Sequence, residues 1–210
     1  MLRYLLLYAL LFLLSCTASR HSIKWLPGAY FNEQELIIKD TVAKLDIRIN
    51  APAATAFNIH KKTTLIFYAL PNGNSIEWTM GKAMQPGDDW HFDIQHIAAQ
   101  TRYIRNAMPD QNIIVAYMGT IQKSWPAWKK QTPNAIFKIK ALVDSIVNLF
   151  AAYHPQIVLD SHSGGGSFVF GYLDAVKSIP DNVKRIGFID SDYGYEDSLH
   201  GKKLTDWLLS

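Results

Sequence analysis

The residues best suited to chemistry lie in one short run, Ser161-His162-Ser163-Gly164-Gly165. The apolar segment before it, residues 156–160 (QIVLD), predicts a strand, and the residues from Ser167 onward predict a helix. A serine at such a sharp turn holds its hydroxyl clear of the sheet, and small residues two positions before and after it keep strand and helix apart. The first helical N–H groups then point to where an oxyanion would develop. The pattern therefore predicts a nucleophilic hydroxyl at Ser163.

This run resembles the nucleophile elbow, G-x-S-x-G, of the α/β-hydrolases, with Ser161 in place of the first glycine. The resemblance covers roughly residues 40–210. It implies serine acyl transfer, in which Ser163 attacks an ester carbonyl and backbone N–H groups hold the oxyanion. One of these donors would be Gly164, and the other would come from Asn72 or Gly73 in the loop after the expected strand 64–70. No cofactor is expected, and the substrate would be a small ester or a peptide.

The acid and the histidine of a triad are harder to place. Asp190 ends the strand expected after the elbow, residues 184–190, and is the candidate acid; a helix cap or a loop hydrogen bond is the alternative role. None of the seven histidines occupies the family's base position. We therefore expect the histidine, and further strands of the sheet, to lie beyond Ser210. On that expectation the 210-residue chain is a C-terminally truncated domain that is inactive by itself.

Other functions are compatible with the same residues. A glycine-rich turn before a helix can cradle a phosphate, although the spacing matches neither a P-loop nor G-x-G-x-x-G. The elbow could also be retained in a non-catalytic protein that binds glycan or peptide at the surface. A serine peptidase of the same fold is a further alternative. Trp125 and Trp128 follow an expected strand and are candidates for an aromatic substrate wall, with ordinary packing as the alternative.

The N-terminus predicts export. An apolar run over residues 4–14 follows a basic start, and it is too short to span a bilayer. It ends in Leu-Leu-Ser-Cys, which resembles the lipobox of bacterial lipoproteins. We expect residues 1–15 to be a signal peptide and Cys16 to be lipidated, which would hold the protein to a membrane of the cell envelope. A plain signal peptide is the alternative. Residues 16–38 would be a tether and entry segment, and residues 39–210 the domain.

The rest of the chain alternates strand and helix patterns. Strands are expected at residues 41–50, 64–70 and 112–118, with helices at residues 89–108 and from Thr132 onward. This order predicts an α/β fold, a mostly parallel sheet with helices on both faces. The net charge of +3 is scattered, so we expect no nucleic-acid partner. One cysteine excludes an intramolecular disulfide, and no histidine spacing is typical of a metal site.

Overall fold

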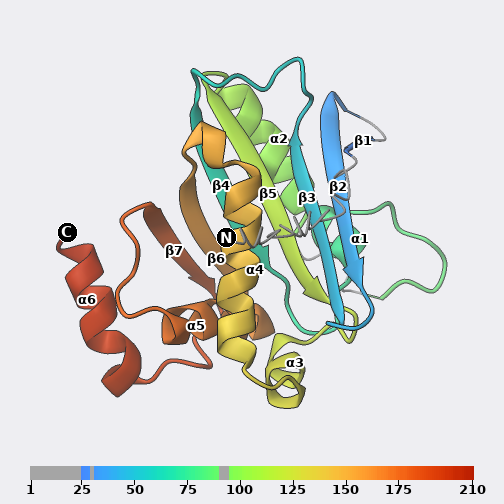
Figure 1. Cartoon of the computed structure of the whole chain (residues 1–210). Coiled ribbons are helices and arrows are strands. Elements are labelled where there is room, and N and C mark those ends of the chain that lie inside the picture. Colours follow the sequence, from blue (N-terminus) through green and yellow to red (C-terminus); the bar gives the residue numbers. More distant parts are fainter. Residues whose placement is uncertain (1–24, 29–30, 90–94) are drawn as a thin grey trace, which may run out of the picture.

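The chain folds around a single mixed sheet (Figure 1). The computed structural model describes residues 25–28, 31–89 and 95–210, so the expected signal peptide and Cys16 lie outside the described residues. The seven strands are hydrogen-bonded in the order β1-β2-β3-β5-β4-β6-β7. Their bounds are β1 Leu26–Pro27, β2 Glu33–Asp40, β3 Leu45–Pro52, β4 Lys62–Ala69, β5 Gln111–Thr120, β6 Gln156–His162 and β7 Val183–Ile189.

The centre of the sheet is parallel, because β5, β4, β6 and β7 pair parallel with one another. β1, β2 and β3 form an antiparallel ribbon that joins this centre along β5. The helices are α1 Ile76–Met80, α2 Ile97–Ala107, α3 Trp125–Gln131, α4 Ala135–Leu149, α5 Gly166–Ala175 and α6 Lys202–Leu208. The predicted α/β class, with a largely parallel core and helices on both faces, is confirmed.

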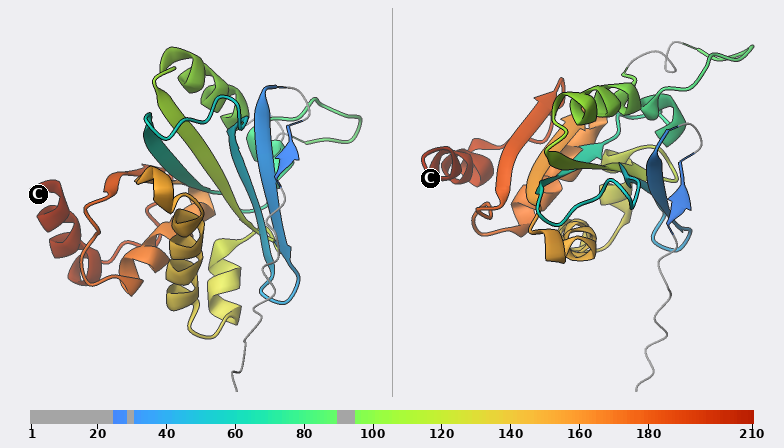
Figure 2. Two further views of the ribbon diagram at one scale, coloured as in Figure 1. Left: turned by 45° about the horizontal axis from the view of Figure 1, so that its top comes forward. Right: turned by 90° about the horizontal axis from the view of Figure 1, so that it is seen from above.

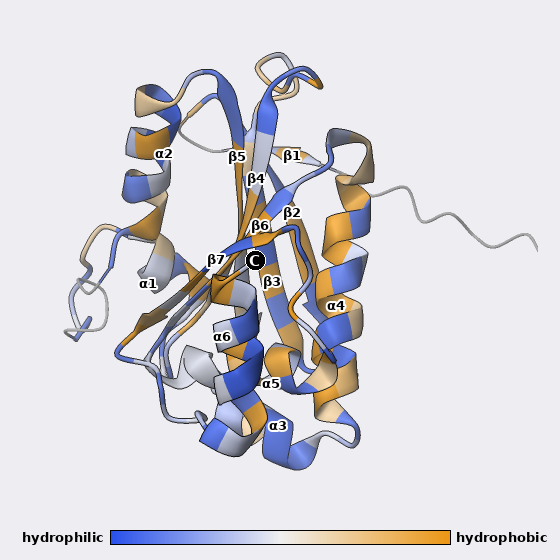
Figure 3. Cartoon of the chain, turned by 90° about the vertical axis from the view of Figure 1, so that its left-hand side faces the viewer, coloured by the Kyte–Doolittle hydropathy of each residue, from blue (hydrophilic) through white to orange (hydrophobic). Residues whose placement is uncertain are grey.

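Two apolar layers hold the helices to the sheet. α1 and α2 cover one face, where Ile76, Met80 and Ile97 pack on residues of β4 and β5. α3, α4 and α5 cover the other face, where the larger core contains Ile139 of α4 and Phe168 of α5 (Figures 2 and 3). β4 and β5 are buried on both faces, which explains their nearly continuous apolar sequences. The described residues contain no helix long and apolar enough to cross a membrane.

Three expected boundaries differ from the structure. The segment expected to be a tether up to residue 38 includes most of β2, which belongs to the sheet. The helix expected over residues 89–108 corresponds to α2, whose first residue is Ile97 and whose N-cap is His96. In the loop before α2, the Asp88 carboxylate accepts hydrogen bonds from Lys82 Nζ and the Gln85 N–H, both at 2.7 Å, and so closes a turn.

The third difference lies between β5 and β6, where a single helix was expected to begin at Thr132. The structure has two helices there. α3 is capped by Ser124, whose hydroxyl accepts from the Ala127 N–H at 3.3 Å, and α4 begins after Asn134 in a left-handed conformation. α3 falls in the segment where an aromatic substrate wall was expected.

The strand order predicts a ligand-binding crevice at the carboxyl ends of the parallel strands. The chain passes from β4 to β5 on one side and later returns to place β6 on the other side of β4. Connections that leave adjacent parallel strands in opposite directions open a crevice at the carboxyl ends of those strands. The loop after β4 (residues 70–75) and the turn after β6 both lie at this edge.

Candidate active site

Ser163 occupies the sharp turn predicted for it. β6 ends at His162, a single 3-10 turn covers Ser163–Gly165, and α5 begins at Gly166. Ser163 has a left-handed φ of 48°, a conformation that costs an ordinary residue about 1 kcal/mol or more. Within the described part of the chain its half-buried hydroxyl makes no hydrogen bond. The turn therefore holds Ser163 in a strained conformation, with no hydrogen-bond partner for its oxygen among the described residues.

Gly165 and Gly166, the N-cap and first residue of α5, are required by close backbone approach. A Cβ on Gly165 would lie 2.2 Å from the carbonyl oxygen of Ala69, at the end of β4. A Cβ on Gly166 would lie 1.9 Å from the carbonyl oxygen of Ser191, in the loop after β7. The turn is thus packed directly against both neighbouring strand ends, which leaves no room for side chains at these positions.

The β4–α1 loop reaches the elbow at Gly164. A Cβ on Gly164 would lie 2.2 Å from Oδ1 of Asn72, so the predicted oxyanion residues Gly164 and Asn72 are neighbours. The N–H of Gly73 donates to the Lys123 carbonyl at 2.9 Å and is therefore engaged. Of the two loop residues named from the sequence, Asn72 lies against Gly164, the residue that follows Ser163. Asn74, in the same loop, is 2% exposed, and its amide makes no hydrogen bond within the described residues.

Ser161, which replaces the first glycine of the elbow pattern, has a structural role. Its side chain is fully buried, and its Oγ lies 2.6 Å from the Oγ of Ser191. Ser191 also donates to the Ser161 carbonyl at 3.3 Å. This pair joins the elbow to the loop after β7. Sequence reasoning missed Ser191, because no local pattern marks a serine whose partner lies 30 residues away.

Asp190 lies at the same sheet edge as Ser163. His162 is in register with Ile189, so the residues that follow them, Ser163 and Asp190, end adjacent strands side by side. Both have left-handed backbones, with φ of 48° and 44°. The structure thus brings the candidate acid near the candidate nucleophile, while its catalytic role stays a prediction.

His162 faces the α2 side of the sheet. Its Nδ1 is hydrogen-bonded to the Nε2 of Gln95, a second residue that sequence reasoning missed. Burial lowers the pKa of the His162 ring, and the nearby charge of Asp190 opposes this by raising it. Burial therefore favours the neutral form of the His162 ring. On the same face, burial raises the pKa of Asp160, and the charge of Arg185 partly offsets that effect.

The influence of Asp190 on His162 can be measured. We expect His162 to titrate below the ordinary histidine pKa of about 6.5, and Asp190→Asn to lower its pKa further, because a favourable negative charge is lost. Two-dimensional NMR of the ring protons as a function of pH gives both values. Asp192→Asn, which changes an exposed carboxylate two positions away, is the control and should leave the titration unchanged. A rise in the His162 pKa in Asp190→Asn would contradict the placement of Asp190.

No described histidine is hydrogen-bonded to Ser163. His200 is 1% exposed; its Nδ1 accepts from the Glu196 N–H at 2.9 Å, and its Nε2 pairs with Asp174 at 2.8 Å. This pair fastens the C-terminal helical segment to the end of α5. His91 lies outside the described residues. Within the described ranges, no group of three or more His, Cys, Asp or Glu side chains could hold a metal ion.

For the two tryptophans of the segment 124–128, the structure favours ordinary packing, the alternative left open by the sequence, over a substrate wall. Trp125 and Trp128 are 1% and 2% exposed and pack edge to face in the core, with ring centroids 5.3 Å apart. Their indole N–H groups donate to the carbonyls of Met118 and Ala43, at 2.9 and 2.8 Å. Because α3 turns both rings inward, they leave no surface for a substrate.

Comparisons with known proteins find distant structural likenesses. No family model matches the chain, and no curated protein matches it. A thermostable esterase structure is 14% identical, with a TM-score of 0.43, over 84% of this chain and 52% of its own. A Lactobacillus plantarum protein provisionally named a carboxylesterase is 15% identical, with a TM-score of 0.38, over 71% and 50%. Oligopeptidase B from Trypanosoma brucei is 14% identical, with a TM-score of 0.35, over 76% and 21%.

The chain thus spans about half the length of the two esterase-type structures.

Proposed function

We propose that this chain carries the nucleophile elbow of a serine hydrolase that acts on a carboxylic ester. The observation that supports the proposal is the backbone of Ser163, held left-handed at a strand-to-helix turn with its hydroxyl unbonded within the described residues. A strained conformation at a residue with a reactive side chain is typical of functional sites. The elbow also lies at the switch point of the sheet, where open α/β sheets bind their ligands.

In the proposed reaction the Oγ of Ser163 attacks the ester carbonyl carbon. The new C–O bond forms as the carbonyl oxygen takes up negative charge beside the N–H groups of Gly164 and Asn72. The alcohol then leaves with a proton, and water hydrolyses the acyl-serine to the acid. A general base must take the serine proton, and Asp190 is the candidate to orient it. The proposal includes attachment to the cell envelope through a lipid on Cys16.

A fluorophosphonate probe tests the nucleophile. Its reaction forms a Ser Oγ–phosphorus bond and releases fluoride, so only an activated serine is labelled quickly. The test uses the full-length protein, expressed from its complete gene with any codons that follow Ser210. We expect peptide mass spectrometry to find the adduct on Ser163, and Ser163→Ala to abolish labelling. Ser167→Ala removes a hydroxyl four residues further along the chain and should leave labelling intact.

Two results would contradict the proposal: labelling of Ser163→Ala at the parental rate, or a parent protein that is not labelled at all. Thermal unfolding of each variant checks that the fold is retained. Ser163→Ala removes only an oxygen that makes no hydrogen bond within the described residues, so we expect little change in stability.

A further inference from the structure

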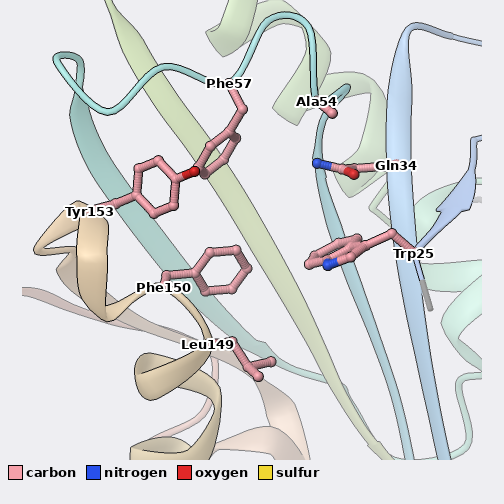
Figure 4. Close-up of a pocket in the computed structure, with 7 residues that line it drawn as sticks. All are labelled: Trp25, Gln34, Ala54, Phe57, Leu149, Phe150 and Tyr153. Carbon is pink, nitrogen blue, oxygen red and sulfur yellow. The ribbon is translucent and has the colours of Figure 1, made fainter. Parts of the chain in front are cut away.

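The sheet carries a second concave site at the end opposite the elbow (Figure 4). It is a cavity of about 290 Å³ lined by four aromatic side chains, Trp25, Phe57, Phe150 and Tyr153, with Gln34 at one side. We call this cavity the aromatic pocket. Neither the elbow pattern nor the proposed hydrolysis makes use of it.

The aromatic pocket is built from segments distant in sequence. Trp25 directly precedes β1, Gln34 lies in β2 and Phe57 in the β3–β4 connection, while Phe150 and Tyr153 come from the segment between α4 and β6. Because that segment leads into the start of β6 and Ser163 follows its end, the seven residues of β6 separate the two sites. At about 3.3 Å per residue, this separation is about 20 Å. The pocket therefore cannot receive a group that is reacting at Ser163.

Phe150, which is 4% exposed, is the floor of the pocket, and the half-buried Trp25, Phe57 and Tyr153 stand around it. The Trp25 ring meets Phe150 at 62°, with centroids 6.0 Å apart, and Phe57 meets Tyr153 at 85°, with centroids 4.5 Å apart. Figure 4 shows Trp25 and Gln34 facing Phe57, Phe150 and Tyr153 across the space between them. Because the rings of each pair are in contact, a ligand ring would lie between Trp25 on one side and Phe57 and Tyr153 on the other, over Phe150.

The polar atoms at the pocket define what such a ring must carry. None of the lining residues bears a formal charge at neutral pH, so a charged ligand would lose its hydration without gaining a partner. The Nε2 of Gln34 donates to the Pro52 carbonyl at 3.0 Å, and within the described residues its Oε1 is uncommitted. The Trp25 indole N–H likewise makes no hydrogen bond in the described part of the chain. A neutral acceptor and a neutral donor thus flank the aromatic faces.

We propose that the aromatic pocket binds one neutral pyranose unit of a glycan, independently of Ser163. The faces of a pyranose carry C–H groups that pack on aromatic rings, and its equatorial hydroxyls both donate and accept hydrogen bonds. This combination matches ring walls that carry one amide oxygen and one indole N–H. The pocket's volume of about 290 Å³ leaves room for one such ring.

Titration calorimetry with three neutral hexasaccharides tests the proposal: cellohexaose, N-acetylchitohexaose and maltohexaose. We expect saturable binding of at least one of them, weakened at least about tenfold in Trp25→Ala and in Tyr153→Ala. Trp25→Leu keeps apolar volume while removing the ring, which guards against an effect of lost packing. Phe137→Ala is the matched control, because Phe137 is a 60% exposed aromatic on α4 that does not line the pocket.

The proposal is overturned if the parent binds none of the three sugars, or if Trp25→Ala and Trp25→Leu bind as tightly as the parent. It is also overturned if indole, an aromatic ring without hydroxyls, binds the pocket more tightly than every hexasaccharide. Ser163→Ala should bind the sugars unchanged. Loss of labelling at Ser163 and loss of sugar binding would therefore be separate results, and either proposal can fail without the other.

Discussion

Gly165→Ala should cost the chain much of its stability, although it adds only one methyl group. Gly165 has an ordinary right-handed backbone, with φ of −61°, so the substitution introduces no strained φ. The new Cβ would instead lie 2.2 Å from the carbonyl oxygen of Ala69 and 2.7 Å from its carbonyl carbon. These are backbone atoms of a central strand and cannot rotate away. We expect a loss of about 3 kcal/mol or more in the free energy of unfolding.

Denaturant unfolding followed by circular dichroism gives this number, and Gly87→Ala is the control. Gly87 has a φ of +92°, and a Cβ added there would meet no atom within 4 Å, so alanine introduces backbone strain without collision. We expect about 1 kcal/mol for that control. An effect of Gly165→Ala no larger than that of Gly87→Ala would show that the elbow does not pack against β4 as described. Such a result would also remove the support that this packing lends to the position of Ser163.

Glu33→Ala should be comparably severe, because it leaves two arginines of α2 without their anion. Glu33 is 8% exposed and accepts from Arg102 through both carboxylate oxygens at 3.0 Å, and from Arg105 at 2.9 Å. Arg105 also donates to the carbonyls of Asn50 and Ile113, which ties α2 to β3 and β5. Removing one partner of a buried ion pair costs about 3–5 kcal/mol.

The control is Asp206→Ala, which breaks an exposed pair with Lys202 four residues earlier on the chain. Exposed pairs of this kind contribute about 0.3–0.5 kcal/mol. Unfolding midpoints of the two variants should therefore differ widely at neutral pH. A small effect of Glu33→Ala, similar to that of the control, would contradict a buried role for this cluster.

The same carboxylate predicts a pH dependence. Burial by itself would raise the pKa of Glu33, but hydrogen bonds from Arg102 and Asn50 and the charges of both arginines outweigh it, so the pKa is lowered. A group with a lowered folded pKa stabilises the protein above its unfolded pKa, about 4.3 for glutamate. That contribution is lost as the pH falls through the folded pKa. The difference in the free energy of unfolding between the parent and Glu33→Gln should therefore shrink as the pH falls from the unfolded pKa through the folded pKa.

Several features could be predicted from the sequence because they are local. A strand pattern followed within a few residues by Ser163, two glycines and a helix pattern specifies the turn by itself, since all the atoms that form it are close in the chain. The alternation of strands and helices similarly specified the α/β class and the buried central strands. The positions of Asn72 and Gly164 followed from the strand order that this class implies.

Tertiary structure decided what depends on distant partners. Glu33 meets Arg102 across 69 residues, and Ser161 meets Ser191 across 30, and neither pairing has a signature in local composition. The direction in which a tryptophan points was equally hidden, because Trp125 is buried only once α3 has formed and packed on Phe168. The aromatic pocket, assembled from separate segments, had no sequence signal at all. Steric constraints between residues close in the chain thus determined the turn at Ser163. The residues that pack around this turn were determined by contacts between distant segments.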